Sequence, residues 1–446
     1  MHIDTSQFLI IGKHSLIDKS SLPDSVWAAT APLPIETYPL EEDISTEVVI
    51  IGGGYTGLST ALHLGPDICP VVLESNDIGY GASGRNNGLV IPTLSKADPE
   101  EIIRTYGKEK GEQTIALIRD SASLVFDLIR KHNMEKAGEQ NGWIQPAHSP
   151  GRMKLVEKRV KEWGDRGLKV DLLEREQLEK ITGSKAWFGG WIAHEGGTVH
   201  PMAYVRGLAK AASSLGAKIY TNSPALSLIC DNDHWIVKTE NGSVKASRIV
   251  LATNAYTDDL WPRLRRTFVP VKTWQMATKP LSDNVRKTVL PGRHGLSDTR
   301  GDLEFARYDW DGRLVSGASL IFDFNSEERL KEHVGKRLQK NFPQIGEVEW
   351  EFIWNGFLSM TTDYLPRLHV LAPGVFTWLG CNGRGVALST AMGAVLADLV
   401  RGQSINDAPL PVTDLKTVPG HGLVTRFART SLLNRRISDR KELNLE

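Results

Sequence analysis

Cysteine is scarce in this chain, and long apolar runs are absent. Only three of the 446 residues are cysteine, and Cys69, Cys230 and Cys381 show no metal-binding or CxxC spacing. We therefore expect inert core or near-core thiols, a reducing cytoplasmic environment and no metal site. No stretch approaches the roughly 20 apolar residues that a transmembrane helix needs. Residues 1–4 lack the pattern of a secretory signal.

An excess of charge of one sign is also missing. The 53 basic side chains balance 53 acidic ones, so the composition gives no reason to expect nucleic acid as a partner. One basic run, residues 426–440, favours a solvated terminal helix or tail, and a contact with a membrane surface or partner is the alternative. A length of 446 residues predicts two domains.

The most informative segment runs from residue 48 to Glu74. The apolar residues 48–51 suit a buried parallel strand. Gly52 then allows a tight turn, Gly54 a close approach to pyrophosphate, and Gly57 close packing of a helix. Glu74 ends the next strand, where a carboxylate accepts ribose hydroxyls and repels the 2′-phosphate of NADP. We interpret the segment as a dinucleotide-binding βαβ unit. An ordinary glycine-rich loop is the alternative, and the unit alone does not separate FAD from NAD.

Apolar periodicity and turn residues predict the other elements. We expect helices over residues 99–133, 151–163, 201–215, 326–341 and 386–400. We expect strands over residues 217–220, 235–239, 244–246, 248–254, 271–278, 302–309, 313–318, 349–357 and 375–380. Strand-to-helix turns recur at Asn254 and Gly380. This favours FAD, whose ring needs backbone from several remote segments, whereas an NAD domain usually runs without such interruptions.

The alternation of elements predicts an α/β protein. We expect a Rossmann-like FAD-binding domain, discontinuous in sequence, with an inserted mixed-sheet (α+β) substrate domain. The FAD-binding domain is predicted to comprise residues 46–98, 196–262 and 355–412. The substrate domain is predicted to comprise residues 99–195 and 263–354. Residues 1–45 are expected to form an N-terminal arm, and residues 413–446 a C-terminal tail.

Several segments together resemble the D-amino-acid oxidase superfamily of FAD enzymes. The superfamily resemblance rests on residues 50–59, 79–86 and 379–386. Within the superfamily the chain most resembles the γ-glutamylputrescine oxidase and L-pipecolate oxidase branch, through residues 197–204, 251–257 and 354–356. The similarity covers about residues 25–410.

The resemblance implies a set of FAD contacts. It places the ADP half of FAD on Gly52, Gly54, Tyr55, Thr56, Gly57 and Glu74. It places the pyrophosphate and isoalloxazine beside Ser83, Gly84, Arg85, Asn86, Asn87 and Gly88. It assigns further contacts to Ala225, Thr253, Asn254, Gly383, Arg384, Gly385 and Val386. A solvated arginine on a plain turn is the alternative for Arg85 and for Arg384. FAD is expected to be noncovalent, because residues 357–363 lack the cysteine that tethers flavin in sarcosine-type oxidases, and residues 79–94 lack a histidine.

The resemblance also implies an activity. We expect oxidation of a CH–NH bond of an amine or amino acid to an imine, by hydride transfer to flavin N5, with O₂ reduced to hydrogen peroxide. The expected substrates are γ-glutamylputrescine-like or pipecolate-like. The alternatives are a dehydrogenase that uses a quinone or protein acceptor, and a non-catalytic flavin-binding protein.

The substrate contacts are expected on the sheet that covers the flavin ring. The candidates are Trp274, Gln275 and Arg307, with Arg300 as a substitute for Arg307. An arginine there could pair with a substrate carboxylate, and a surface ion pair is the alternative for Arg307. We expect no catalytic side chain beyond the flavin itself, and structural roles for His194 and His200.

Overall fold

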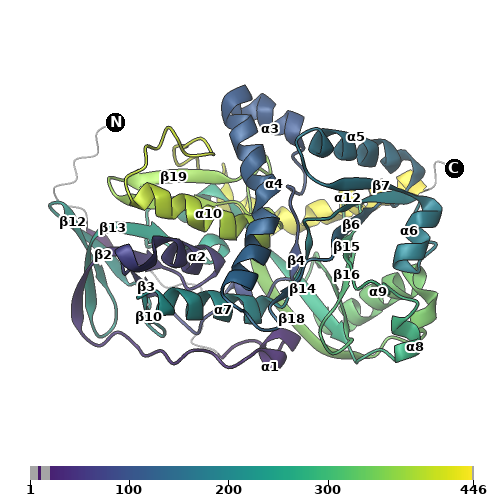
Figure 1. The fold of residues 1–446 in the computed structure, drawn as a ribbon, viewed down its shortest axis with the longest axis horizontal. Coiled ribbons are helices and arrows are strands. Elements are labelled where there is room, and N and C mark those ends of the chain that lie inside the picture. The colour runs from purple at the N-terminus through teal and green to yellow at the C-terminus, as the bar shows by residue number, and fades with distance from the viewer. Residues whose placement is uncertain (1–8, 12–20, 444–446) are drawn as a thin grey trace.

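The computed structural model describes residues 9–11 and 21–443. Residues 1–4, on which the expected lack of a secretory signal depends, lie outside this part. Two sheets with their helices lie side by side, and the long helix α4 (Lys108–Lys131) runs between them (Figure 1). Among the described helices, none is both long and apolar enough to cross a membrane.

The first sheet has a parallel centre that is drawn from distant parts of the chain. Its order is β1-β11-β12-β13-β2-β3-β10, with β20 beside β13 and β19 beside β20. The bounds are β1 Leu9–Ile11, β2 Asp43–Ile51, β3 Val71–Leu73, β10 Lys218–Tyr220, β11 Ser227–Asp231, β12 His234–Lys238, β13 Ser243–Leu251, β19 Arg367–Ala372 and β20 Val375–Leu379. The predicted strands of the βαβ unit are confirmed, and so is the hairpin, which β12 forms with the first part of β13; the strands expected over residues 244–246 and 248–254 are therefore one strand.

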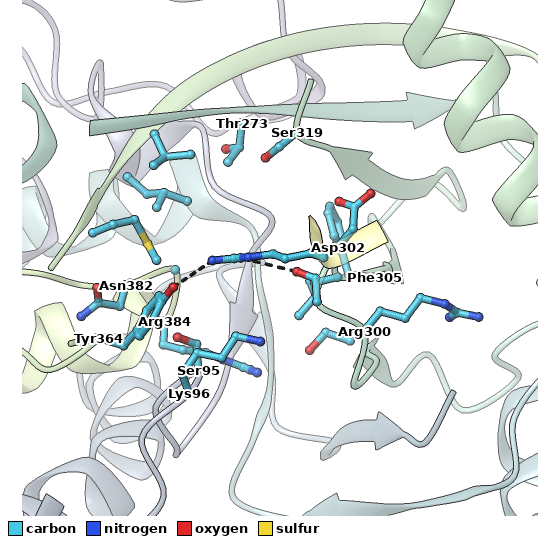
Figure 2. Close-up of a pocket in the computed structure, with 18 of the residues that line it drawn as sticks. Ser95, Lys96, Thr273, Arg300, Asp302, Phe305, Ser319, Tyr364, Asn382 and Arg384 are labelled. Carbon is cyan, nitrogen blue, oxygen red and sulfur yellow. Dashed lines mark hydrogen bonds between the residues drawn. The ribbon is translucent and has the colours of Figure 1, made fainter. Parts of the chain in front are cut away.

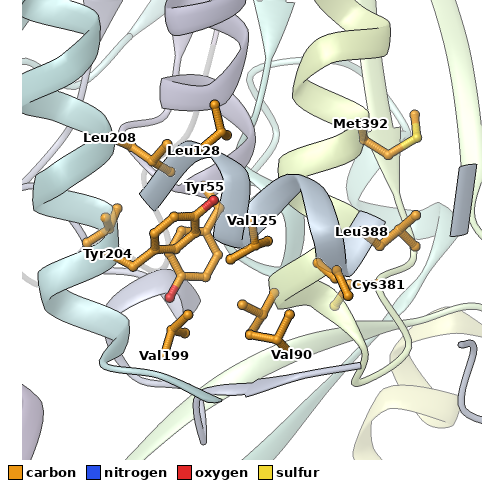
Figure 3. Packing of buried hydrophobic residues seen from close by; sticks show 14 of the residues in the cluster. Tyr55, Val90, Val125, Leu128, Val199, Tyr204, Leu208, Cys381, Leu388 and Met392 are labelled. Atoms are coloured by element: carbon orange, nitrogen blue, oxygen red, sulfur yellow. The ribbon is translucent and has the colours of Figure 1, made fainter. Parts of the chain in front are cut away.

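Three helices cover one face of this sheet and pack against α4. They are α2 Tyr55–Leu64, α7 Pro201–Ser214 and α10 Gly385–Val400. Their shared core includes Tyr55 and Tyr204, whose ring centroids lie 5.1 Å apart, together with Val125 and Leu388 (Figure 3). A Cβ at Gly393 would lie 2.5 Å from Cβ of Ser59, so α10 and α2 approach closely where glycine stands.

The second sheet is mixed. Its order is β18-β14-β17-β16-β15-β6-β8-β7, and only the β15 and β6 pair is parallel. The bounds are β6 Trp143–Pro146, β7 Val170–Glu174, β8 Gly189–Ala193, β14 Val269–Thr278, β15 Gly295–Ser297, β16 Phe305–Tyr308, β17 Leu314–Ala318 and β18 Trp350–Met360. Helices α5 Met153–Gly164, α6 Arg175–Thr182, α8 Asp283–Arg286 and α9 Ser326–Asn341 accompany it. A small sheet, β4 (Leu89–Val90), β9 (Gly197–Val199) and β5 (Gly138–Glu139), adjoins both larger sheets.

Three expectations differ from the structure. The helix expected over residues 99–133 is two helices, α3 Pro99–Tyr106 and α4, because Gly107 adopts φ 81°. The strand expected over residues 302–309 is only β16, because Asp298 accepts the backbone N–H groups of Arg300 and Glu304 and folds that segment into a loop. The expected domain boundary at residue 355 falls inside β18, which pairs with β14 along its length.

The two terminal segments are more structured than an arm and a tail. Ser25 caps a short helix, α1 (Val26–Thr30), whose Trp27 is fully buried and donates a hydrogen bond of 2.9 Å to the carbonyl of Asn86. Helices α11 (His421–Phe427) and α12 (Ser431–Leu443) form the C-terminal segment.

All three cysteines were expected to lie in or near the core, but not all of them do. Cys381 is buried, whereas Cys230 is half-buried and Cys69 is exposed. Cys230 shares a face of β11 with the buried Leu228 and packs against the core, but it lies one residue from the end of the strand, where its side chain is only half-covered.

Candidate functional site

The glycines between β2 and α2 stand where a side chain does not fit. Gly52 has φ 116°, and a Cβ there would lie 2.8 Å from the carbonyl oxygen of Ala252. A Cβ at Gly57 would lie 2.0 Å from the carbonyl oxygen of Gly52, which shows how closely α2 packs on the turn. The turn therefore exposes backbone at the N-terminus of α2, which is an arrangement that favours anions.

Glu74 lies at the end of β3, beside this turn. Its carboxylate accepts hydrogen bonds from the backbone N–H of Gly53 at 2.7 Å and of Asn76 at 3.0 Å. Loss of surrounding water raises the pKa of Glu74, and the two hydrogen bonds oppose that effect. The carboxylate has lone pairs left with which to accept ribose hydroxyls.

A small cavity of about 120 Å³ opens over the turn and Glu74. It is lined by most of the residues expected to contact the ADP half of FAD, and by some of the other expected FAD contacts: Gly52, Gly54, Tyr55, Thr56, Glu74, Ser83, Ala225, Thr253 and Asn254. Ser83 Oγ accepts the N–H of Tyr55 at 2.9 Å, so the next loop reaches the start of α2. Gly57 lies behind this cavity, where it allows the helix to pack.

The side chains of Arg85 and Asn86 hold their own loop in place. Arg85 donates to the carbonyls of Tyr80 at 2.6 Å and Asn355 at 3.2 Å. Asn86 donates to the carbonyls of Ala82 and Ser83, both at 3.0 Å, and accepts the N–H of Gly88 at 2.8 Å. Neither residue is among those that line the small cavity. The hydrogen bonds of these two side chains thus fix the conformation of the loop that contains Gly84. The backbone of the loop, rather than these side chains, is left to contact a cofactor.

A large cavity of about 660 Å³ lies under the second sheet (Figure 2). The expected residues that line it are Asn87, Trp274, Gln275, Arg300, Gly383 and Arg384. Ser359 connects the two cavities, because its hydroxyl donates to Asn254 of the small cavity and its carbonyl accepts the N–H of Asn382, a large-cavity residue, at 3.0 Å.

The N-terminus of α10 forms one wall of the large cavity. Gly380, Asn382 and Gly383 all have positive φ, and this turn directs the chain into α10 with Arg384 at the N-cap. Arg384 is 6% exposed, and its guanidinium lies 4.7 Å from the ring centroid of Trp143. Its Nη1 has no hydrogen-bond partner among the described residues, and burial lowers its pKa to about 9. A buried cation and free helix N–H groups therefore face the same space, with Gly385 and Val386 just behind them.

Gln275 enters the large cavity from β14, whereas Trp274, the preceding residue of the strand, faces the opposite side of the sheet and packs against the core beside α9. Gln275 is 7% exposed. Within the described residues, neither Gln275 Oε1 nor Trp274 Nε1 has a hydrogen-bond partner. Unpaired buried polar atoms are costly unless a ligand satisfies them.

The structure does not support the expected substrate role of Arg307. Its side chain is fully buried and donates to the carbonyls of Tyr308 at 2.9 Å, Gly88 at 3.3 Å and Val199. Its guanidinium also lies 5.1 Å from the ring centroid of Trp27, and it is not part of the cavity lining. The alternative of a surface ion pair is wrong too, because Arg307 is buried and its hydrogen bonds link β16 to the segments that contain Gly88 and Val199.

Arg300 lines the large cavity but is already paired. Its guanidinium contacts Asp298 and lies 3.3 Å from a carboxylate oxygen of Glu304. Figure 2 shows its end directed away from the centre of the cavity. Burial raises the pKa of Asp298, and the adjacent guanidinium opposes that rise.

The two histidines have structural positions. His200 is buried and accepts the N–H of Ala203 at 3.1 Å, so it caps α7, and burial lowers its pKa to about 3. His194 pairs with Asp171 at 2.8 Å on the surface.

The sequence interpretation missed most residues of the large cavity, and among them are the polar residues Lys96, Tyr364, Asn382 and Arg435. Lys96 follows β4, Tyr364 and Asn382 flank β19 and β20, and Arg435 belongs to α12. No local motif marks Lys96 or Tyr364. Asn382 lies within residues 379–386, which carried part of the family resemblance, and Arg435 lies in the basic run at residues 426–440.

The first sheet has a parallel centre and a glycine turn suited to a dinucleotide, and the second sheet covers a large cavity beside it. These two parts are typical of a dinucleotide-dependent enzyme. The family model described as FAD dependent oxidoreductase (DAO) matches residues 47–399. The chain belongs to this family, so the predicted resemblance, fold class and enzyme class are confirmed, and a non-catalytic role is set aside.

Curated relatives span most of the chain. Gamma-glutamylputrescine oxidoreductase of Escherichia coli (strain K12) is 29% identical over 387 residues, which are 85% of this chain and 89% of the relative. A probable oxidoreductase, OrdL, of Haemophilus influenzae is 30% identical over 374 residues, 82% of this chain and 85% of the relative. The crystal structure of glycine oxidase from Geobacillus kaustophilus superposes with a TM-score of 0.69 at 22% identity, covering 83% of this chain and 98% of that one. At this identity, the similarity to glycine oxidase shows a shared fold only.

Proposed function

We propose that this protein is an FAD-dependent oxidase that converts the CH–NH bond of an amine or amino acid to an imine and reduces O₂ to hydrogen peroxide. The observation that carries the proposal is the pairing of the two cavities through Ser359. One cavity has a glycine turn and an acid suited to the ADP half of FAD. The other has a buried cation at a helix N-terminus, with room beside it for a substrate.

The residues present fit FAD. Glycine is required at the turn by the contacts that a Cβ would make, and Glu74 offers acceptors to a ribose. FAD, when bound, supplies the acceptor for a hydride from the carbon that bears the amine. Arg384 and the N–H groups that begin α10 stabilise negative charge on the ring.

The second sheet positions the substrate in this proposal. Gln275 orients it through its unpaired amide oxygen, and β14 with its neighbours keeps bulk water from the reacting carbon. The first sheet with α2, α7 and α10 is then the FAD-binding domain, and the second sheet is the substrate domain. The name of the Escherichia coli relative supports γ-glutamylputrescine as the first substrate to test, with L-pipecolate as the second.

We further propose that FAD is bound noncovalently. Among the described residues, neither a cysteine nor a histidine lines either cavity. Cys381 is 5% exposed and belongs to the core between α2 and α10 (Figure 3). Acid precipitation of the purified protein is therefore expected to leave the yellow colour in the supernatant, and colour in the pellet contradicts the proposal.

Anaerobic mixing with candidate amines tests the function. We expect γ-glutamylputrescine or L-pipecolate to bleach the flavin absorbance, and readmitted air to restore it with stoichiometric hydrogen peroxide. Bleaching that readmitted air does not reverse, but that an added quinone does, identifies a dehydrogenase with another acceptor. A protein that binds no FAD after incubation with it refutes the proposal.

A further inference from the structure

The C-terminal segment forms a wall of the large cavity. Arg429, Leu432 and Arg435 line it, from the turn before α12 and from α12 itself. This segment lies beyond residue 399, where the match to the family model ends. A part of the cavity is therefore built from residues outside the shared family region.

Helix α12 is fixed in place by charged contacts. The carboxylate of Asp439 accepts the backbone N–H of Gly301 at 2.8 Å and of Asp302 at 3.1 Å. Arg436 pairs with Asp302 at 2.7 Å, and Glu442 pairs with Arg152 at 2.6 Å. Arg435 lies just before these anchors, so its position in the wall is set by them.

Arg435 faces the cavity without a carboxylate partner. Its guanidinium donates to the hydroxyl of Tyr364 at 2.8 Å and approaches the carbonyl of Gly301 at 3.5 Å. Both partners are neutral. No carboxylate of the described chain lies within ion-pair distance of it, so its positive charge is not neutralised by the protein.

Lys96 is a second cation in the same cavity (Figure 2). Lys96 lines the cavity although much of its side chain is exposed, and within residues 21–443 the side chain makes no hydrogen bond or ion pair. Burial and, to a smaller extent, the nearby cations Arg435, Arg159, Arg152 and Arg384 together lower its pKa to about 8. No acidic group counters this effect.

The carboxylates that line the cavity are already paired. Asp98 binds Arg159 at 2.8 Å, Asp298 binds Arg300, and Asp302 binds Arg436. Like charges placed close together without a counter-charge are unfavourable, and an anionic ligand relieves the repulsion. Guanidinium and ammonium groups are the usual partners of carboxylates in proteins.

We propose that the substrate carries a carboxylate at the end away from the reacting amine, and that Lys96 and Arg435 bind it. Arg435 is then a specificity-determining residue supplied by the C-terminal helix. The inference rests on the proposed function for the identity of the reacting end. The anion site itself is testable without turnover.

Calorimetry of the FAD-loaded protein with glutarate tests the site, because glutarate has carboxylates but no amine to oxidise. We expect glutarate to bind at least about 10-fold more tightly than glutaramide, its uncharged analogue. Arg435→Gln and Lys96→Gln are each expected to weaken glutarate binding by about 10-fold or more, since a hydrogen bond to a charged group contributes that much. Arg435→Lys is expected to retain part of the affinity.

The matched control is Arg440→Gln, an exposed arginine on the same helix, which is expected to bind glutarate like the unaltered protein. Equal binding of glutarate and glutaramide overturns the inference. So does unchanged glutarate affinity in both Arg435→Gln and Lys96→Gln, or an equal loss in the control. If no amine reduces the flavin while glutarate binds as expected, the proposed function fails and the anion site stands.

Discussion

Replacement of Glu74 by glutamine removes the negative charge of the side chain and keeps its shape, so it tests the role of the charge alone. The carboxylate accepts two backbone N–H groups, at 2.7 Å and 3.0 Å, and in our proposal it also accepts ribose hydroxyls. A hydrogen bond to a charged group contributes about 1.5–3 kcal/mol, which corresponds to about 10- to 100-fold in affinity. Glu74→Gln is therefore expected to weaken FAD binding by that factor, as measured by fluorescence titration of the apoprotein.

The pH dependence of FAD binding gives a second readout of the same group. Burial raises the pKa of Glu74 in the apoprotein, whereas a ribose that donates hydrogen bonds favours the carboxylate. FAD binding then releases a proton wherever the carboxyl is partly protonated, so affinity falls as the pH is lowered into that range and is constant above it. Glu74→Gln is expected to lose this dependence.

The control is Glu47→Gln, an exposed acid on β2, which is expected to leave FAD binding unchanged. Unaltered affinity in Glu74→Gln, or a pH dependence that persists in it, refutes the role of the carboxylate.

Three further predictions concern packing and charge. Gly57→Ala is expected to yield no folded protein, because the added Cβ would lie 2.0 Å from a backbone oxygen. Thermal unfolding measures this, and a cooperative transition near that of the unaltered protein contradicts the prediction. Trp27→Ala is expected to destabilise the protein by about 3–5 kcal/mol in urea unfolding, since Trp27 is fully buried, and a loss below about 1 kcal/mol shows that α1 is loosely attached. Glutarate affinity is expected to be constant around neutral pH, where both of its carboxylates are charged, and to fall as the pH rises through about 8, where Lys96 loses its proton, with a weaker fall in Lys96→Gln.

The sequence predicted the nucleotide-binding part well because its signals are local. The glycine spacing, the apolar strand and Glu74 all act within one continuous segment, and β2, α2 and β3 follow them. The turn into α10 was similarly marked by glycines. In each case, the backbone conformation depends on residues only a few positions apart.

The substrate side was predicted less well because it depends on tertiary contacts. Arg307 occupies a strand of the covering sheet, as expected, but two carbonyls from distant loops and the ring of Trp27 occupy its guanidinium. Lys96 and Arg435 lie far apart in sequence, and they line the same cavity only because α12 folds back over it. Nothing in the local pattern around either residue indicates that meeting.

In our proposal, the position of α12 makes substrate choice separable from cofactor binding. The helix follows the last element of the nucleotide-binding fold, touches the second sheet through its own ion pairs and contributes a cation to the cavity. Exchange of this single terminal segment can therefore alter which substrates are accepted while the flavin-binding residues stay the same. In related chains, sequence divergence after the shared region becomes a place to look for changes in substrate preference.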